Sequence, residues 1–243
     1  MREPIQGLIF DKDGTLFDFN ATWSAWCHGF ILGLAEGDAA RAEALAERLG
    51  YDLESRRFRK SSLLIAGTME IVVDAARAVR PDFGEIPLRR HIVASTAAAP
   101  QVEAAPLAAL LDRLRDAGLV LGVATNDSEE PARAHLERAG VLDRFAFIAG
   151  YDSGHGAKPT PGMLLAFCAA TGLAPEACAM IGDSVHDLAS GRAAGMTTVG
   201  VLTGPASEED LAPHADVILP DIGALPGWLR LPEAELPGIG ENP

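Results

Sequence analysis

The sequence predicts an α/β fold, a Rossmann-like doubly wound parallel sheet with an α-helical domain inserted after its first strand. Two observations predict it. From residue 100 onward, short apolar segments typical of buried strands alternate with segments typical of helices. This order produces βαβ units and a parallel sheet. From residue 22 to residue 98, the helical pattern continues without a strand signal.

The first predicted strand and the inserted helices differ clearly in residue pattern. Residues 5–10 are mostly apolar and run into the polar residues 11–14, a pattern that predicts a buried strand followed by a loop. After residue 22, apolar residues recur every three or four positions, as they do on one face of a helix. Gly50 and Pro81 stand where two of these patterns stop. We expect helices at 22–35, 38–49, 68–79 and 87–98.

The second half of the chain alternates regularly between the two patterns. Glycines at 118, 140, 172 and 195 follow the predicted helices and are typical helix stops. Thr160 is expected to cap a helix whose first residue is Pro161, where proline is favoured. The predicted helices are 106–117, 128–139, 161–171 and 184–194, with a short one at 222–228. The predicted strands are 119–124, 145–148, 178–181, 197–201 and 216–219.

These patterns predict how the chain is divided. We expect residues 1–17 and 100–230 to form the α/β core, since strands occur only there. Residues 18–99 form the helical insertion. Residues 231–243 form a C-terminal tail, because prolines recur after residue 220.

The composition excludes several classes of protein. The 243 residues are 48% hydrophobic and 22% charged, close to average globular usage, so the bulk of the chain is not disordered. The net charge of −14 argues against extended contact with nucleic acid and against anionic membrane surfaces. An anionic substrate therefore needs a local cationic pocket or a bound metal.

The cysteines and the N-terminus bear on location. Cys27, Cys168 and Cys178 show neither a CxxC pair nor metal-ligand spacing, and we expect them to be buried apolar residues. No signal peptide is visible, and no apolar run approaches the roughly 20 residues that span a bilayer. We expect a protein of the reducing cytoplasm, with no membrane partner.

Polar side chains gather at the carboxyl ends of the predicted strands, where open parallel sheets bind ligands. They are Asp11, Asp13, Thr125, Asn126, Asp183 and Asp187, with Lys158 in the loop after residues 145–148. Carboxylates on one rim repel one another, and Mg²⁺ compensates when it is held by carboxylates and substrate phosphate oxygens. Lys158 adds a positive charge, the Thr125 hydroxyl suits a phosphate oxygen, and Gly14 allows close approach of the backbone.

Four motifs, in order along the chain, resemble the signatures of the haloacid dehalogenase (HAD) superfamily. The first is DKDGTL at residues 11–16, and the second is Thr125-Asn126. The third is KPTP at 158–161, and the fourth is GDSVHD at 182–187. The first motif is specific to the superfamily, whereas the second and third identify it only together with the others in this order. With the surrounding pattern, the resemblance covers about residues 5–230.

The resemblance implies a role for each matching residue. Asp11 would be the nucleophile that forms an aspartyl-phosphate, and Asp13 the general acid and base. Mg²⁺ would be held by Asp11, Asp183 and the backbone carbonyl of Asp13. Thr125, Asn126 and Lys158 would bind the phosphate, and Asp187 would position Lys158 or a metal-bound water.

The resemblance also narrows the reaction. Dehalogenases and phosphonate hydrolases of the superfamily lack an aspartate where Asp13 stands, so Asp13 favours a phosphatase or a phosphomutase. The insertion matches the family's helical cap, which implies a small phosphorylated metabolite as partner. The chain is similar to phosphoglycolate-phosphatase-like members, including sugar-phosphate and nucleotide phosphatases. A phosphomutase, a phosphoacceptor signalling module and a non-catalytic binding protein stay as alternatives, and we expect a monomer or a homodimer.

Two features of the insertion bear on substrate choice. The basic run at residues 56–62 could meet a substrate carboxylate or a second phosphate, or it could be a solvated helix face paired with glutamates. Trp23, Trp26 and Phe30 share one face of the first inserted helix, which places them in the core. His155 and His186 fall in loops near the site, where we expect rim residues.

Overall fold

The computed structural model describes residues 4–59, 62, 64 and 69–232. Its centre is a six-stranded sheet in the order β5–β4–β1–β6–β7–β8, with every neighbouring pair parallel. The strands are β1 (Gly7–Phe10), β4 (Val120–Ala124), β5 (Phe147–Ala149), β6 (Cys178–Gly182), β7 (Thr197–Val201) and β8 (Val217–Leu219). The strand order reverses at β1, as in a doubly wound sheet. The predicted fold class is confirmed.

The central strand β1 shows why this sheet is buried on both faces. Its four residues are all buried, and Gly7 lies opposite Val120 of β4 and Cys178 of β6. Leu8 and Phe10 belong to one apolar cluster, and Ile9 belongs to another. Alternate residues of a strand point to opposite faces, so a continuous apolar run fills the core on both sides of the sheet.

Helices cover both faces of the sheet. α5 (Leu107–Asp116) and α6 (Glu129–Arg138) add leucines to the cluster of Leu8 and Phe10. α7 (Gly162–Thr171) and α8 (Val185–Ala194) add residues to the cluster of Ile9. Shorter helices are α9 (Glu208–Leu211), α10 (Leu225–Trp228) and the 3-10 turns Leu142–Arg144, Pro175–Ala177 and Ile222–Ala224.

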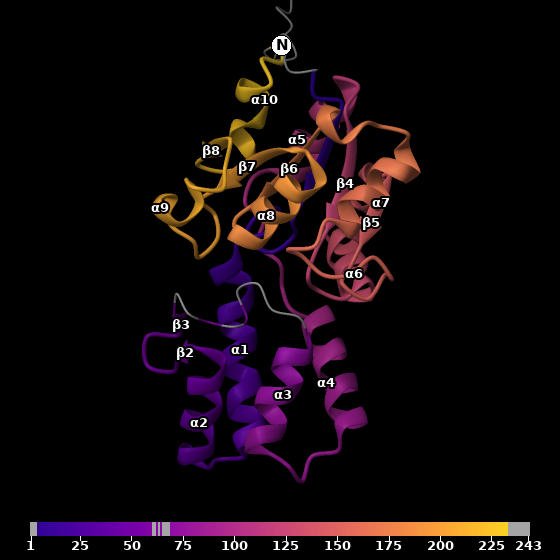
Figure 1. Cartoon of the computed structure of the whole chain (residues 1–243). Helices are drawn as coiled ribbons and strands as arrows, with labels where there is room; N and C mark the ends of the chain where they lie inside the picture. Colours follow the sequence, from indigo (N-terminus) through magenta and orange to yellow (C-terminus); the bar gives the residue numbers. More distant parts are fainter. Residues whose placement is uncertain (1–3, 60–61, 63, 65–68, 233–243) are drawn as a thin grey trace, which may run out of the picture.

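A second, helical body lies at one end of the sheet, between β1 and α5 in the sequence (Figure 1). It consists of α1 (Phe19–Ala35), α2 (Ala39–Leu49), α3 (Met69–Val79) and α4 (Glu85–Ala97). These helices pack around an apolar cluster of their own, which includes Ile31, Leu45 and Leu88. The helical body thus has an apolar core distinct from the clusters on the two faces of the sheet.

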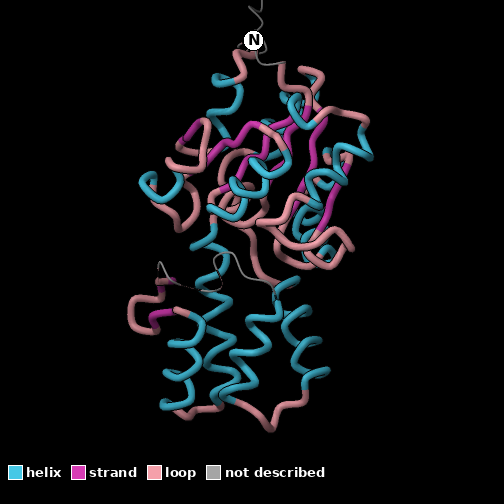
Figure 2. The backbone as a smooth tube through the Cα atoms, in the orientation of Figure 1, coloured by secondary structure: helices cyan, strands magenta, loops and turns pink. Residues whose placement is uncertain are grey.

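The expectation that no strand interrupts residues 22–98 was wrong. A two-stranded antiparallel hairpin follows α2, formed by β2 (Tyr51–Asp52) and β3 (Arg57–Phe58) (Figure 2). Tyr51 lies opposite Phe58, with ring centroids 5.2 Å apart, and both rings pack in the apolar cluster of the helices. Strands of two residues are too short to show the alternation that predicts a strand.

The described residues of the basic run at 56–62, which are 56–59 and 62, therefore do not form a helix face. Arg57 is in β3, and the Arg59 guanidinium lies 2.5 Å from the Glu47 carboxylate on the exposed surface. Residues 60 and 61 lie outside the described part of the chain.

Most predicted helices and strands are present with ends shifted by a few residues, and one predicted cap is wrong. The α7 helix starts at Gly162 after Pro161. The Thr160 hydroxyl instead donates a hydrogen bond to the Ala157 carbonyl, at 2.7 Å. Of the C-terminal tail predicted at residues 231–243, residues 233–243 lie outside the described part of the chain. Within the described ranges, no helix has the length and apolar character needed to cross a bilayer.

The two connections between the bodies run side by side. Asp18 donates its backbone N–H to the Val102 carbonyl at 2.8 Å, and Ala104 donates to the Leu16 carbonyl at 2.9 Å. This pairing fixes where α1 leaves the sheet and places the helices over the end of β1.

Candidate active site

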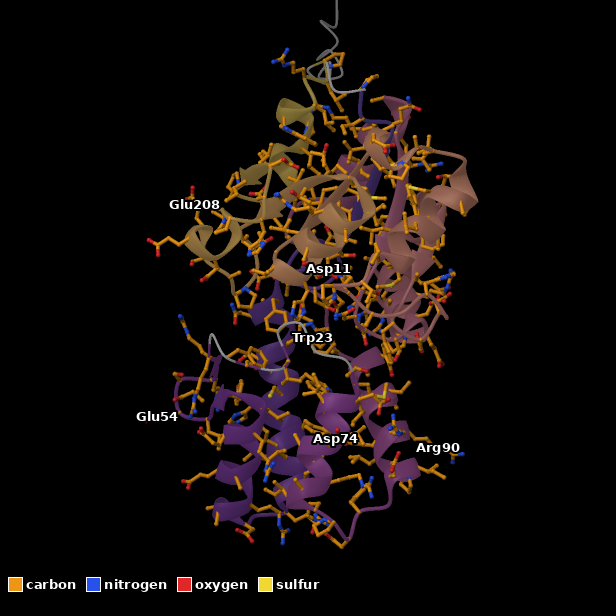
Figure 3. The ribbon with its side chains drawn as sticks, viewed as in Figure 1. Asp11, Trp23, Glu54, Asp74, Arg90 and Glu208 are labelled. Atoms are coloured by element: carbon orange, nitrogen blue, oxygen red, sulfur yellow. The ribbon has the colours of Figure 1, made fainter. Side chains whose placement is uncertain are left out.

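The predicted site residues gather where the helical body faces the carboxyl ends of the strands. Asp11 follows β1, and its backbone N–H donates to the Ile181 carbonyl of β6 at 2.8 Å. Figure 3 shows Asp11 between the two bodies, with Trp23 of α1 just below it. Because β1 and β6 are neighbours in the sheet, Asp183 after β6 reaches the same place as Asp11.

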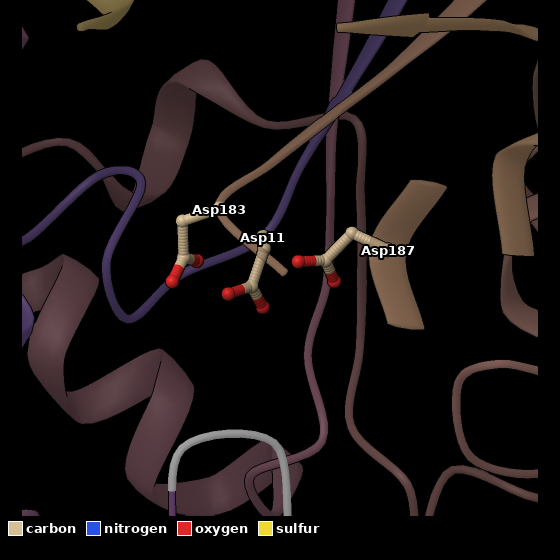
Figure 4. Close-up of side chains that lie close together, drawn as sticks. All are labelled: Asp11, Asp183 and Asp187. Carbon is tan, nitrogen blue, oxygen red and sulfur yellow. The ribbon is translucent and has the colours of Figure 1, made fainter. Parts of the chain in front are cut away.

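Three carboxylates meet there, as Figure 4 shows. Oxygens of Asp11, Asp183 and Asp187 all lie within 4.8 Å of one another, and the three side chains are buried. Burial raises the pKa of Asp11 to about 7, against the lowering effect of Lys158. Burial also raises the pKa of Asp183 well above its usual range, and Asp11 and Asp187 raise it further. Ionising all three carboxylates together is therefore unfavourable unless a cation lies beside them.

Lys158 supplies the nearest positive charge. Its ammonium lies 2.6 Å from oxygens of both Asp11 and Asp187, and it donates to the Ala124 carbonyl at 2.7 Å. Asp187 is held in turn by Ser184, whose hydroxyl and backbone N–H both donate to it at the start of α8. These contacts hold the ammonium between the two aspartates.

Asp183 shows the clearest sign of a missing cation. Its Oδ1 accepts a hydrogen bond from the Thr15 hydroxyl at 3.3 Å, whereas its Oδ2 is buried without a hydrogen-bond partner among the described residues. A buried carboxylate oxygen without a partner is unfavourable. Hard oxygen ligands of this kind suit Mg²⁺. The residues present thus fit a divalent cation.

Two glycines make room for the Asp183 carboxylate. Gly14 has a φ of +87°, and a Cβ there would lie 2.4 Å from Asp183 Cγ. A Cβ at Gly204 would lie 1.7 Å from Asp183 Oδ2. The predicted need for glycine at position 14 thus has a steric cause. Gly204 has no signal in the sequence, because it comes close only through the loop after β7.

The two residues of the second motif, Thr125 and Asn126, have different roles in the structure. Thr125 lines the pocket, and its Oγ1 accepts the Asp127 N–H at 3.1 Å, so its hydroxyl can donate its own hydrogen to a phosphate oxygen. The Asn126 amide instead bonds to the backbone of Lys158, accepting from its N–H at 2.8 Å and donating to its carbonyl at 3.0 Å. Asn126 therefore fixes the loop that carries the lysine.

Asp13 lies beside a second lysine. Its Oδ2 is 2.6 Å from the ammonium of Lys12, which is fully buried. Asp13 Oδ1 is buried without a hydrogen-bond partner among the described residues, and Asp13 lines the pocket. The Lys12 ammonium also lies 3.0 Å from His135 Nδ1 and 5.3 Å from the centre of the Trp23 ring.

His135 connects Lys12 to the helical body. The imidazole of α6 is buried, and its Nε2 lies 2.8 Å from the Thr96 carbonyl of α4. Burial and the nearby Lys12 charge together lower the pKa of His135 to about 4. A neutral ring then carries its hydrogen on Nε2, because Lys12 can only donate to Nδ1.

A pocket lies between the two bodies, beside this cluster of carboxylates. Asp11, Asp13, Thr125, Lys158 and Asp187 line its sheet side. The side facing them comes from α1, β3, α3 and α4, together with Leu64. The chemistry-bearing groups are thus enclosed rather than displayed on an open surface.

Comparison with known proteins agrees with this architecture. Residues 5–195 match the family described as haloacid dehalogenase-like hydrolase. The chain belongs to the haloacid dehalogenase-like hydrolases. The match spans all four motifs.

Relatives and a solved structure match this hydrolase over nearly its whole length. A phosphoglycolate phosphatase of Rhodospirillum rubrum is 30% identical over 249 residues, covering 98% of this chain and 99% of the relative. An N-acetylmuramic acid 6-phosphate phosphatase of Pseudomonas aeruginosa is 29% identical, covering 90% and 92%. The crystal structure of a predicted phosphoglycolate phosphatase from Haemophilus somnus has a TM-score of 0.71 at 18% identity, covering 92% and 97%. The chain is thus a HAD-like phosphatase.

The structure of this hydrolase brings every predicted site residue to one place. Trp23 and Phe30 are buried as expected, and Trp23 and Trp26 also line the pocket. His186 lines the pocket at the start of α8. Sequence reasoning missed Lys12, His135 and Gly204. A lysine between two motif aspartates at the end of a buried strand was a usable signal for Lys12, whereas His135 had none.

The buried histidine predicts a pH effect on stability. In the unfolded chain His135 takes up a proton near pH 6.5, whereas in the folded protein it stays neutral down to about pH 4. Stability therefore falls as the pH drops through this window, because the unfolded state binds the extra proton. His135→Gln keeps an uncharged hydrogen-bond acceptor and donor at this position. Between pH 7.5 and pH 4, its free energy of unfolding should fall by roughly 3 kcal/mol less than that of the wild type.

Urea unfolding at a series of pH values measures this loss in both proteins. His155→Gln, which changes an exposed histidine, is the matched reference. Identical pH dependence in wild type and His135→Gln would contradict the neutral buried imidazole.

Proposed function

We propose that this HAD-like hydrolase is a Mg²⁺-dependent phosphatase that hydrolyses a small phosphate monoester through an aspartyl-phosphate on Asp11. The observation that carries the proposal is that Asp11 and Lys158 line the pocket together, while Asp183 lies beside Asp11 with one buried oxygen that has no hydrogen-bond partner among the described residues. A carboxylate can act as a phosphoryl acceptor. The named relatives act on phosphoglycolate and on N-acetylmuramic acid 6-phosphate, both of them phosphate monoesters.

The first chemical step uses Asp11 and Asp13. A carboxylate oxygen of Asp11 attacks phosphorus, the bond from phosphorus to the ester oxygen breaks, and Asp13 gives its proton to the departing alkoxide. Lys158 and the Thr125 hydroxyl bind the phosphoryl oxygens, so their fixed charge and dipole stabilise the transition state. Asn126 and Asp187 keep Lys158 in position.

The second step reverses the role of Asp13. Its carboxylate takes a proton from a water molecule as that water attacks the phosphorus of the aspartyl-phosphate. Phosphate leaves, and the Asp11 carboxylate is regenerated. The helical body serves as a cap that limits the entry of bulk water and of large substrates.

We assign the metal to Asp11, Asp183 and the backbone carbonyl of Asp13. The structure also groups the carboxylate of Asp187 with Asp11 and Asp183. Lys158 and Ser184 already bind Asp187, so we assign it to positioning. When bound, Mg²⁺ supplies positive charge that neutralises the carboxylates and the phosphoryl group.

Removing the metal tests the proposal directly. Phosphate release is measured from phosphoglycolate, sugar phosphates, nucleotides and phosphoserine, first with Mg²⁺ and then with a chelator. We expect release from at least one ester, lost with the chelator and restored by added Mg²⁺. Phosphoryl transfer between sugar positions without phosphate release would instead indicate a mutase, and no reaction at all would contradict the phosphatase proposal.

The ligand role of Asp183 has its own readout. Asp183→Asn should raise the Mg²⁺ concentration for half-maximal activity by about 10-fold or more, since a carboxylate ligand is lost. Asp74→Asn removes the same charge from the exposed face of α3 and is the matched control. An unchanged Mg²⁺ requirement in Asp183→Asn would exclude Asp183 as a ligand.

The cysteines support the location that we propose, the cytoplasm. All three are free and buried, as expected in a reducing compartment. We propose a small metabolite as the partner.

A further inference from the structure

The two sides of the pocket differ sharply in chemistry. The sheet side carries the charged groups described above. The facing wall is apolar and consists mainly of Trp23, Trp26, Phe58, Met69, Val72 and Ile92. These residues come from α1, β3, α3 and α4, so the wall is assembled from most of the helical body rather than from one helix face.

The aromatic part of the wall is held rigidly. The rings of Trp23 and Trp26 meet edge to face, with centroids 5.5 Å apart. The Trp26 indole N–H already donates to the Ser95 hydroxyl at 3.1 Å, and its ring stacks on Phe30. Trp26 therefore offers a substrate an aromatic surface. Such a surface binds flat or apolar groups.

No cation faces the substrate from this wall within the described residues. The pocket-lining residues that can carry positive charge are Lys158 and His186, and both belong to the sheet side. None of the described arginines of the helical body lines the pocket, and two of them pair with acids of their own body. Arg80 lies 2.9 Å from Asp82, and the Arg89 guanidinium binds Glu70.

This distribution of charge constrains the part of the substrate beyond its phosphate. If the phosphate lies on Asp11 and Lys158, the alcohol portion extends toward the apolar wall. A carboxylate or a second phosphate there would lose its water without gaining a partner, which is strongly unfavourable. An apolar or aromatic group would gain from burial.

Resting on the proposed phosphatase function, we propose that the substrate is a phosphate monoester of an uncharged, apolar alcohol that carries an aromatic or similarly flat ring. Phosphoglycolate, whose alcohol portion ends in a carboxylate, does not fit this wall. The preferred substrate therefore differs from that in the name of the Rhodospirillum rubrum relative.

Three esters test the proposal: benzyl phosphate, ethyl phosphate and phosphoglycolate. Ethyl phosphate and phosphoglycolate have similar size and differ in charge, whereas benzyl phosphate adds the ring. We expect kcat/KM for benzyl phosphate to exceed that for phosphoglycolate by about 100-fold or more, with ethyl phosphate between them. A preference for phosphoglycolate over ethyl phosphate would overturn the proposal.

A binding measurement separates this proposal from the phosphatase proposal. Calorimetry with Asp11→Asn, which we expect to be inactive, gives the Kd of each ester without turnover. Tighter binding of benzyl phosphate than of phosphoglycolate supports the apolar wall even if the wild type releases no phosphate. Phosphate release with the opposite order of Kd values would leave the phosphatase function standing and overturn the substrate class.

A charge placed in the wall should change the preference. Met69 lines the pocket at the start of α3 and is only partly buried, so Met69→Arg can point a cation inward. We expect the ratio of kcat/KM for benzyl phosphate to that for phosphoglycolate to fall by about 10-fold or more. Ile86→Arg, on the exposed side of α4 at 67% exposure, adds the same charge outside the pocket and should leave the ratio unchanged.

Lys60 provides the strictest check. It is the one cation between Arg59 and Met69 in the sequence, and it lies outside the described residues. Lys60→Met should leave the order of the three esters as in the wild type. If the wild type prefers phosphoglycolate and Lys60→Met loses that preference, Lys60 is the missing cation and the proposal is wrong.

Discussion

Replacing Asp11 with asparagine should abolish turnover and leave the fold intact. The amide is nearly isosteric with the carboxylate but is a very weak nucleophile, so no phosphoenzyme forms. We expect phosphate release to fall by a factor of at least about 10⁴. Steady-state phosphate release measures the loss, and acid quenching during turnover tests for a phosphorylated protein in the wild type alone.

The same substitution should stabilise the protein in the absence of metal. Burial raises the pKa of Asp11 to about 7, so the folded state resists ionisation of a group that ionises near pH 3.9 in the unfolded chain. The wild type therefore loses stability as the pH rises from 4 to 7, whereas Asp11→Asn does not, because its amide stays neutral. At pH 8 with a chelator, we expect Asp11→Asn to be more stable by about 2–4 kcal/mol.

Added Mg²⁺ should reduce that difference, because a ligand that binds the folded wild type stabilises it. Asp74→Asn again serves as the control, since it removes an exposed carboxylate. Residual turnover near the wild-type rate would contradict the nucleophile assignment. A destabilised Asp11→Asn in chelator would contradict the picture of three crowded carboxylates that the single charge of Lys158 does not balance.

The fold was predictable from the sequence because its signals are local. The strand β1 is a continuous apolar run that ends at Asp11, and glycine follows α2, α7 and α8 directly in the left-handed conformation. The hairpin β2–β3 was not predictable from periodicity, because its stability comes from the contact between Tyr51 and Phe58 and from bonds of Ser24 to Tyr51 and Arg56. The bonds of Ser24 join residues that are 27 and 32 positions apart in the sequence.

The residues of the site likewise include some that the sequence predicts and some that it does not. The motif residues were predictable because strand ends of one parallel sheet converge at one edge. The partners that hold them were not. Asn126 binds the Lys158 backbone across 32 positions of sequence, and His135 lies 123 positions from Lys12. Only the fold brings such pairs together, so a motif can indicate which side chains react but not which ones position them.

Asp13→Asn should separate the two chemical steps. An alkoxide leaving group needs a proton, so phosphoryl transfer from benzyl phosphate should slow by about 10²–10⁴-fold. The p-nitrophenolate anion leaves without a proton, so Asp11 should still take the phosphoryl group from p-nitrophenyl phosphate. Hydrolysis of the phosphoenzyme then lacks its base. We expect a burst of about one p-nitrophenolate per site, followed by a slow phase.

Stopped-flow absorbance records the burst, and acid quenching should recover the phosphoenzyme. Asp127→Asn is the matched control, because Asp127 also faces Lys12, at 3.4 Å, and also lines the pocket. If Asp13 acted only by holding Lys12, its loss would slow both esters equally and give no burst. Proton transfer predicts unequal losses, because only one of the two leaving groups needs the proton that Asp13 supplies.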